Sequence, residues 1–151
     1  MTETITLDLN CEGTKLKMGV VFGRHEQPGL ALRHYTDLDF RTEEIGELCV
    51  KMRELLKNSN RGDAPLRELE KTGQLLYDEL LTLQVKDALR QRKPSFLIFS
   101  IDESLVPIPW ELLFDGENFL SLKYGTARNV RTKQKPRSSF QAQRRRAFPL
   151  K

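Results

Sequence analysis

The first part of the chain alternates between apolar and polar residues. Apolar side chains recur at every second position from Ile5 to Leu9 and again from Leu16 to Phe22, with a glycine-containing turn between the two runs. A period of two predicts half-buried strands, and two such runs around a short turn predict a β-hairpin. A second turn at Pro28-Gly29 and a short apolar run after it predict a third strand that ends near Tyr35.

The apolar spacing then changes to three and four residues, which indicates helices. Thr42 is the candidate N-cap of a first helix, whose apolar stripe runs from Ile45 to Leu56. Asp63 is the candidate N-cap of a second helix. This helix is expected to end near Arg92, because Pro94 disfavours helical geometry in the residue before it. The two helices are expected to form an antiparallel hairpin.

A short, almost wholly apolar run follows from Phe96 to Ile101. Such a run predicts a central strand buried on both faces, and a helix directly before it indicates an α/β fold. Pro109 is expected to start a short helix that Asp115-Gly116 closes. From Phe119 the chain is expected to be extended as far as about Val130.

Charge is distributed unevenly along the chain. The 151 residues carry a net charge of +4, but eight Lys or Arg and no Asp or Glu lie in residues 131–151. Residues 1–130 are therefore mildly acidic. The high isoelectric point reflects the basic residues at 131–151 and not the rest of the chain. The predicted organisation is an antiparallel β unit over 1–35, a helix hairpin and the start of an α/β domain over 36–130, and a basic loop or tail over 131–151.

The cysteines give no sign of a metal site or a disulfide framework. Cys11 and Cys49 form no CxxC pair and have no histidine at metal-ligand spacing. We expect a reducing, cytoplasmic location, no metal and no cofactor. The first residues lack the features of a secretion signal, and the longest apolar run is far too short to cross a membrane.

One segment carries a more specific pattern. From Phe96 to Arg128 the order is an apolar strand, an acidic turn, the sequence Pro-Trp-Glu-Leu-Leu, an Asp-Gly turn and a strand that leads to an arginine. The residues that define it are Asp102, Pro109, Trp110, Glu111, Asp115, Gly116 and Arg128. The pattern resembles the start of the CHAT domain, a caspase-like family, and covers about 33 of the 151 residues. The resemblance implies an incomplete caspase-like sheet flanked by helices and preceded by a small antiparallel β unit.

Peptidases of that family carry a histidine and a cysteine after later strands of the sheet. His25, His34, Cys11 and Cys49 all precede the matching segment, so chain order excludes them as that dyad. The sequence therefore predicts no catalytic residue in this chain. The resemblance implies a non-catalytic amino-terminal portion of a CHAT-type cysteine peptidase, which supplies sheet and helices to a dyad located downstream. Residues 148–151 are similar to the approach to a further strand, so a fragment, a processed chain or a truncated chain is expected.

Several side chains have expected roles that do not depend on the family. Trp110 and Phe114 are expected to cover the end of the buried strand, and Glu111 is expected to pair with Arg128. Asp102 and Glu103 follow that strand at its carboxyl end, where open α/β sheets tend to bind ligands. A solvated turn is the favoured interpretation of these two residues. Cys49 lies on the apolar stripe of the first helix and is expected to be a small buried residue.

Two kinds of partner remain open from the sequence. An incomplete sheet has an unpaired edge, which predicts binding to the downstream remainder of the domain or self-association. The alternative is a small stand-alone binding protein whose basic tail contacts nucleic acid or an acidic partner through Arg144–Arg146, Phe140 and Phe148. We favour a solvated linker for this tail, and tail-driven nucleic-acid binding would weaken steeply with salt.

Overall fold

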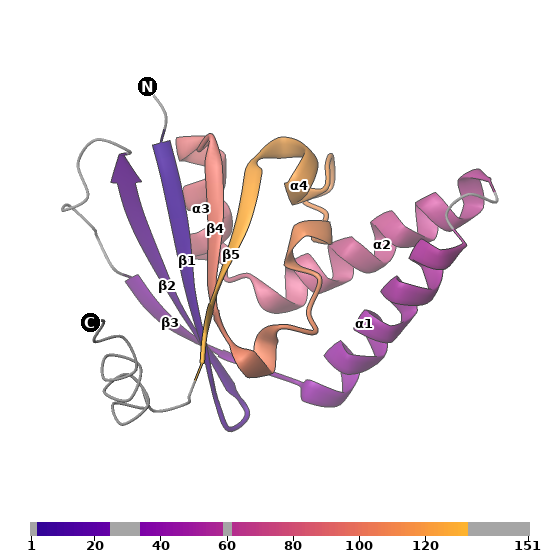
Figure 1. Cartoon of the computed structure of the whole chain (residues 1–151), viewed down its shortest axis with the longest axis horizontal. Helices are drawn as coiled ribbons and strands as arrows, with labels where there is room; N and C mark the ends of the chain where they lie inside the picture. The colour runs from indigo at the N-terminus through magenta and orange to yellow at the C-terminus, as the bar shows by residue number, and fades with distance from the viewer. Residues whose placement is uncertain (1–2, 25–33, 59–61, 133–151) are drawn as a thin grey trace, which may run out of the picture.

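A computed structural model describes residues 3–24, 34–58 and 62–132 (Figure 1). These residues form an α/β fold with one mixed sheet and helices beside it, as predicted. In chain order the elements are β1 (Glu3–Glu12), β2 (Lys15–Arg24), β3 (His34–Asp39), α1 (Thr42–Lys57), α2 (Asp63–Leu80), α3 (Leu83–Arg92), β4 (Phe96–Asp102), α4 (Leu120–Lys123) and β5 (Gly125–Arg131).

The strands lie in the order β3-β2-β1-β4-β5. β1 and β2 form the predicted hairpin, with Leu7 opposite Val20, and β3 continues the antiparallel part. β4 pairs parallel to β1, and β5 pairs parallel to β4. The amino-terminal hairpin and the later strands therefore share one sheet, with β3 and β5 as its outermost described strands.

The third strand lies later in the chain than the sequence predicts. It runs from His34 to Asp39 rather than ending near Tyr35, while the predicted Pro28-Gly29 turn lies outside the described residues. The segment is largely polar, so its apolar pattern is weak. Pairing with Lys15–Val20 of β2 supplies the backbone hydrogen bonds that make it a strand, a tertiary effect that overrides local propensity.

The helices follow the predicted apolar stripes but differ at their ends. α1 and α2 form the expected antiparallel hairpin, with Cys49 and Leu76 buried (Figure 1). Thr42 and Asp63 are the first helical residues and not side-chain caps, so those two predictions were wrong. The second predicted helix is also interrupted after Leu80. Leu81 is extended and buried. A buried apolar residue at this position would also fit a continuing helix, so the apolar pattern alone does not reveal the break.

A new helix, α3, begins after Thr82, whose hydroxyl oxygen accepts a hydrogen bond from the N–H of Val85. This is ordinary N-cap chemistry, and it allows the chain to change direction between α2 and α3 without a glycine or a proline. α3 lies on the same side of the sheet as the core. Its Gln84 accepts a hydrogen bond from Thr36 of β3, which shares the face of the buried Met18.

β4 is central, as predicted, but its two faces are not equally covered. Leu97, Phe99 and Ile101 are fully buried on the helix side. On the other side Phe96 is 43% exposed and Ile98 is half-buried, whereas Ser100 and Asp102 further along the strand are buried. The prediction of burial on both faces was therefore wrong for the first part of this side, because the described helices pack on the opposite one (Figure 1).

The segment between β4 and β5 is more compact than expected. The helix predicted from Pro109 is a single 3-10 turn, Trp110–Leu112, which ends before Asp115-Gly116. The stretch after Phe119 was predicted to be extended, but it forms α4 before β5 begins. A bridge and an edge-on ring contact between Phe114 and Phe119 close the loop, and α4 follows directly.

Residues of one buried cluster join the sheet, the helices and the segment after β4. The large members include Trp110, Phe99, Met52 and Leu76, which come from four different elements. Among the described residues, no helix has both the length and the apolar character that crossing a membrane requires.

Candidate functional site

Trp110 sits at the centre of the segment that carries the sequence pattern. Its ring is fully buried and stacks on Phe99 of β4, with 5.6 Å between ring centroids. Its indole N–H donates a hydrogen bond of 3.0 Å to the carbonyl of Leu105, just after the strand. The predicted contact with the buried strand is confirmed for Trp110, although it lies at the middle of the strand and not at its end. Phe114 packs against Phe119 and lies beside Gly73 of α2. The bond to Leu105 is also the partner that a buried indole requires.

Glu111 and Arg128 form the predicted ion pair. The guanidinium of Arg128 donates to both carboxylate oxygens of Glu111, with Nε–Oε1 at 2.5 Å and Nη2–Oε2 at 2.6 Å. Nη2 also donates to the carbonyl of Ile108, and Nη1 donates to the carbonyl of Val106, each at 2.9 Å. One side chain of β5 therefore binds four acceptors in the segment that holds Trp110. We call this set the Arg128 clamp.

The clamp changes the titration of Glu111. Burial would raise the pKa of this carboxyl, but hydrogen bonds from Arg128 and from the backbone, together with the positive charge of Arg128, hold the pKa below its ordinary value of 4.5. The ionised form is therefore the one that the fold stabilises. Bidentate pairing of this kind depends on the planar guanidinium, which a lysine does not provide.

Replacing Glu111 with glutamine should lower the free energy of unfolding by about 1 kcal/mol at neutral pH, since the pair is partly exposed. The sign of the pH effect follows from the lowered pKa. The stabilisation is present above pH 4.5 and is lost as the pH falls through the lower pKa of the folded state. Urea unfolding at several pH values should show the difference between wild type and Glu111→Gln shrinking as the pH falls below 4.5. A constant difference down to pH 2 would contradict this account.

The Asp115-Gly116 turn is the second polar feature of the segment. One oxygen of Asp115 accepts the N–H groups of Glu117 and Asn118, at 2.9 and 2.8 Å, and the other binds Lys123 of α4 at 2.8 Å. Burial would raise the pKa of Asp115, but these donors lower it. The same contact raises the pKa of Lys123. Gly116 has φ of +102°, a conformation that glycine adopts without strain.

Gly73 of α2 is a contact that sequence reasoning missed. Its carbonyl accepts the N–H of Phe114, and an added Cβ would lie 2.5 Å from the carbonyl oxygen of Leu112. The helix and the tryptophan-bearing segment can approach this closely because position 73 has no side chain. An isolated glycine inside a helical pattern is the signal that points to such a contact.

Polar side chains also meet where β1, β4 and β5 end. Asp102 is buried and accepts the backbone N–H of Cys11 at 2.9 Å. Arg131 reaches across β4 and donates to Asp8 at 2.5 Å, to Asn10 at 2.6 Å and to the carbonyl of Leu9 at 2.7 Å. We call this set the Arg131 network. The sequence interpretation placed Arg131 in the tail and did not anticipate the network.

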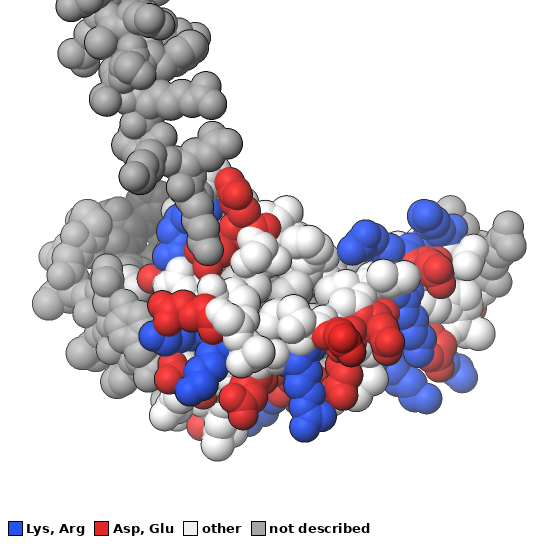
Figure 2. Space-filling view, turned by 90° about the horizontal axis from the view of Figure 1, so that it is seen from below, with Lys and Arg blue, Asp and Glu red and all other residues white. Residues whose placement is uncertain are grey.

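This edge does not present one sign of charge. Figure 2 views the molecule from the side on which the parallel strands end, and acidic and basic side chains are interspersed there. Asp102 is satisfied by Cys11 and lies 3.7 Å from Arg131, while Glu103 is exposed. The favoured interpretation of a solvated turn therefore fits Glu103 and not Asp102, which links two strands.

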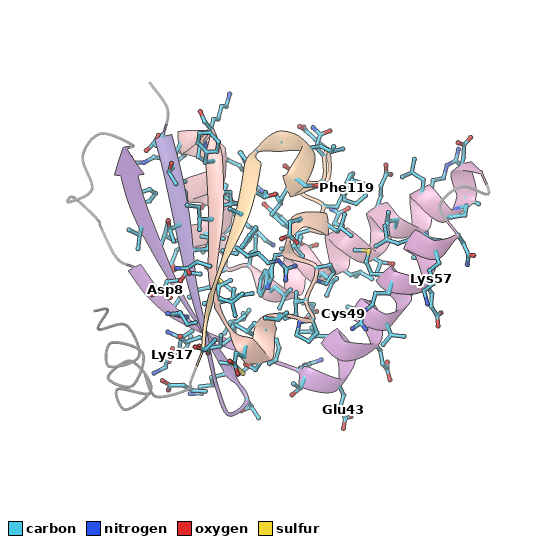
Figure 3. All side chains as sticks on the ribbon, in the orientation of Figure 1. Asp8, Lys17, Glu43, Cys49, Lys57 and Phe119 are labelled. Carbon is cyan, nitrogen blue, oxygen red and sulfur yellow. The ribbon has the colours of Figure 1, made fainter. Side chains whose placement is uncertain are left out.

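Cys11, Cys49 and His34 lie on three different elements, β1, α1 and β3. Cys49 is buried in α1, as predicted, and burial raises the pKa of its thiol, which disfavours the reactive thiolate (Figure 3). Cys11 is half-buried at the end of β1, and His34 lies in β3. His25 lies outside the described residues. Within the described ranges, no group of three or more His, Cys, Asp or Glu side chains is placed to hold a metal ion.

The geometry describes a positioning unit. Together, the Arg128 clamp, the Asp115 turn and the buried Trp110 ring stacked on Phe99 fix β5 against β4. All seven residues of the sequence pattern lie in this unit or at its border, with Asp102 at the end of β4 and Pro109 directly before Trp110. Their partners are mostly backbone groups and each other. The arrangement ties β5 to the segment that carries Trp110.

The comparisons with known proteins do not assign a family. No protein-family model matches the chain, and no curated protein matches it. A solved structure with some similarity is the type II variant of the Ppx/GppA phosphatase from Aquifex aeolicus, at 12% identity and a TM-score of 0.34. The alignment covers 89% of this chain and 37% of the phosphatase, so the chain spans well under half of that protein's length. Similarity at this level supports no inference about function, and the CHAT resemblance stays a prediction.

Proposed function

We propose that this chain is the non-catalytic amino-terminal portion of a CHAT-type, caspase-like cysteine peptidase. Its role is to supply part of the sheet and the flanking helices to a downstream portion that carries the histidine and cysteine. Support comes from the pattern residues, which lie between the end of β4 and β5, with Glu111 and Arg128 paired across this segment. The proposal rests on the sequence resemblance for the family and on the structure for the binding surface.

The observation that carries the binding role is the outer edge of β5. Within the described residues β5 pairs with β4 alone, so one side of its backbone is open. Val130 is 41% exposed on this strand. Unpaired edges are usually blocked by charge, proline or a covering element, because they otherwise recruit another strand. Here the Arg128 clamp holds an open edge in a fixed position, which favours the addition of a partner strand.

The direction of each backbone group on β5 follows from one hydrogen bond. The N–H of Gly125 donates to the carbonyl of Ser95 at 2.9 Å, so it points toward β4. Backbone groups alternate along a parallel strand. The N–H groups of Thr126, Arg128 and Val130 therefore point away from β4, toward the open side. A strand supplied by the downstream portion would bind these groups.

A proline at Val130 tests the edge with little effect on the chain's own sheet. Val130→Pro removes an N–H that faces the open side, and Val130→Ala removes the same side chain but keeps that N–H. We expect both variants to remain folded by circular dichroism. When the chain is co-expressed with the polypeptide encoded directly after Lys151, Val130→Ala should support assembly and cysteine-peptidase activity. Val130→Pro should reduce both.

Two results would contradict the proposal. One is a genomic sequence after Lys151 without an open frame that contains further strands, a histidine and a later cysteine. The other is equal assembly by the two Val130 variants, which would show that the β5 edge is not the contact. Formation of a homodimer that Val130→Pro abolishes would keep the edge as an interface but replace the downstream portion with a second copy.

A further inference from the structure

We propose that residues 133–151 bind across the face of the sheet that the helices leave uncovered, and that their basic side chains pair with carboxylates of β1 and β3. This inference goes beyond the proposed function. It concerns the face of the sheet and not the β5 edge, so it holds or fails independently of any downstream partner. The occupant is a segment of this chain, argued from the four observations that follow.

The first observation is the uncovered face itself. In the strand register, the residues that alternate with the buried positions point away from the helices, and Asp8 lies on that side (Figure 3). The face includes the apolar side chains of Val21, Ile98 and Phe96, which are half-buried or exposed. This face therefore lacks a covering layer among the described residues.

The second observation is the charge of this face. Its carboxylates come from β1, β3 and β4, and they are Asp8, Glu12, Asp37, Asp39 and Asp102. Against these five stand three cations, which are the ammonium groups of Lys15 and Lys17 in β2 and the guanidinium of Arg131 beside Asp8. Lys17 already pairs with Glu12 at 2.9 Å. Asp37 and Asp39 are exposed and lie opposite Lys17 and Lys15 in the register. Five carboxylates against three cations still leave the described part of this face with a net negative charge.

The third observation is the path of the chain at the end of β5. Arg131 is the first of the eight basic residues, and its side chain already crosses the uncovered face from β5 to β1. It binds Asp8 and Asn10 there. The basic segment therefore begins on this face, and Arg131 lies beside Asp8 and Asp102. The Arg131 network is a structural example of the contact proposed for the rest of the segment.

The fourth observation is the composition and length of the segment. Residues 133–151 contain seven Lys or Arg, no Asp or Glu, and the apolar residues Phe140 and Phe148. Nineteen residues can span about 60 Å when extended. Crossing five strands takes only about 20 Å. The segment can therefore reach Asp37 and Asp39 on β3, with its aromatic residues over the apolar part of the face.

Paramagnetic relaxation of the whole chain tests this placement. Cys11→Ser and Cys49→Ala remove the native thiols, and Ser139→Cys carries a nitroxide label. We expect strong broadening of the methyl signals of Val21 and Ile98 on the uncovered face, and little broadening of Val85 on the helix side. The effect should fall at 1 M salt, where the Debye length is about 3 Å.

Matched charge variants identify the contact. Asp37→Asn with Asp39→Asn should reduce the broadening of Ile98 severalfold. Glu43→Gln with Glu44→Gln removes the same charge from α1 and should leave it unchanged. Equal broadening on both faces, or none, would overturn the proposal. Broadening that appears only when nitroxide-labelled chains are mixed with isotope-enriched chains that carry no nitroxide would also overturn the proposal. The occupant of the face would then be a second copy.

Discussion

Replacing Trp110 with alanine should lower the free energy of unfolding by about 3–5 kcal/mol, the usual cost of truncating a large buried aromatic side chain. Three losses add here. The ring is fully buried, its stacking on Phe99 disappears, and the carbonyl of Leu105 loses its indole partner. The remaining cavity lies between β4 and the segment that holds β5, so it cannot collapse without moving one of them.

Urea unfolding followed by far-UV circular dichroism measures this change. Leu122→Ala is the matched control, because Leu122 is 76% exposed on α4, close to the same segment. Its free energy of unfolding should stay within about 0.5 kcal/mol of wild type. If Trp110→Ala cost less than 1 kcal/mol, the segment after β4 would not be part of the core, and the Arg128 clamp would have nothing rigid to attach to.

The second large effect is expected at Gly73, where alanine should destabilise the fold by about 1–3 kcal/mol or more. Alanine normally stabilises a helix relative to glycine. Here the new Cβ would meet the backbone oxygen of Leu112 at 2.5 Å and the Cβ of Phe114 at 3.1 Å. Neither is the flexible end of a side chain, so relief requires α2 to move away from the segment.

Gly46 provides the opposite control in the neighbouring helix α1. A Cβ added there would meet nothing within 4 Å. Gly46→Ala should therefore raise the free energy of unfolding by about 0.5–1 kcal/mol. The two substitutions are chemically identical, and opposite signs in thermal or urea unfolding would isolate the close approach. Stabilisation by both would show that α2 does not contact the tryptophan-bearing segment.

The ion pair of Glu111 with Arg128 was accessible from the sequence. The carboxylate lies beside Trp110 and the arginine lies in the next predicted strand. Because a short loop joins these two adjacent elements, the two side chains are held close enough to pair. The hydrogen bonds from Arg128 to Val106 and Ile108 were not accessible in this way. They depend on the path of a loop that contains two prolines and no regular element longer than a single turn.

The Arg131 network shows the opposite case. Arg131 belongs by composition to the basic tail, and nothing in its local pattern distinguishes it from the residues after it. Its role arises because β5 lies two strands from β1, which places the guanidinium within reach of Asp8 and Asn10. Sheet order is set by pairing between distant segments, so a local sequence window does not contain it.

By itself the sequence determined the α/β class, the hairpin of β1 and β2, the two apolar helix stripes and the buried position of β4. Each of these follows from periodicity, because a strand or helix with one apolar face must bury it. Tertiary structure decided the position of β3, the break at Leu81 between α2 and α3, the formation of α4 and the exposure of one face of the sheet. Those features depend on which surfaces meet across the fold. Which surfaces meet is decided by packing and backbone pairing between segments far apart in the chain, and local patterns of residue types do not predict these contacts.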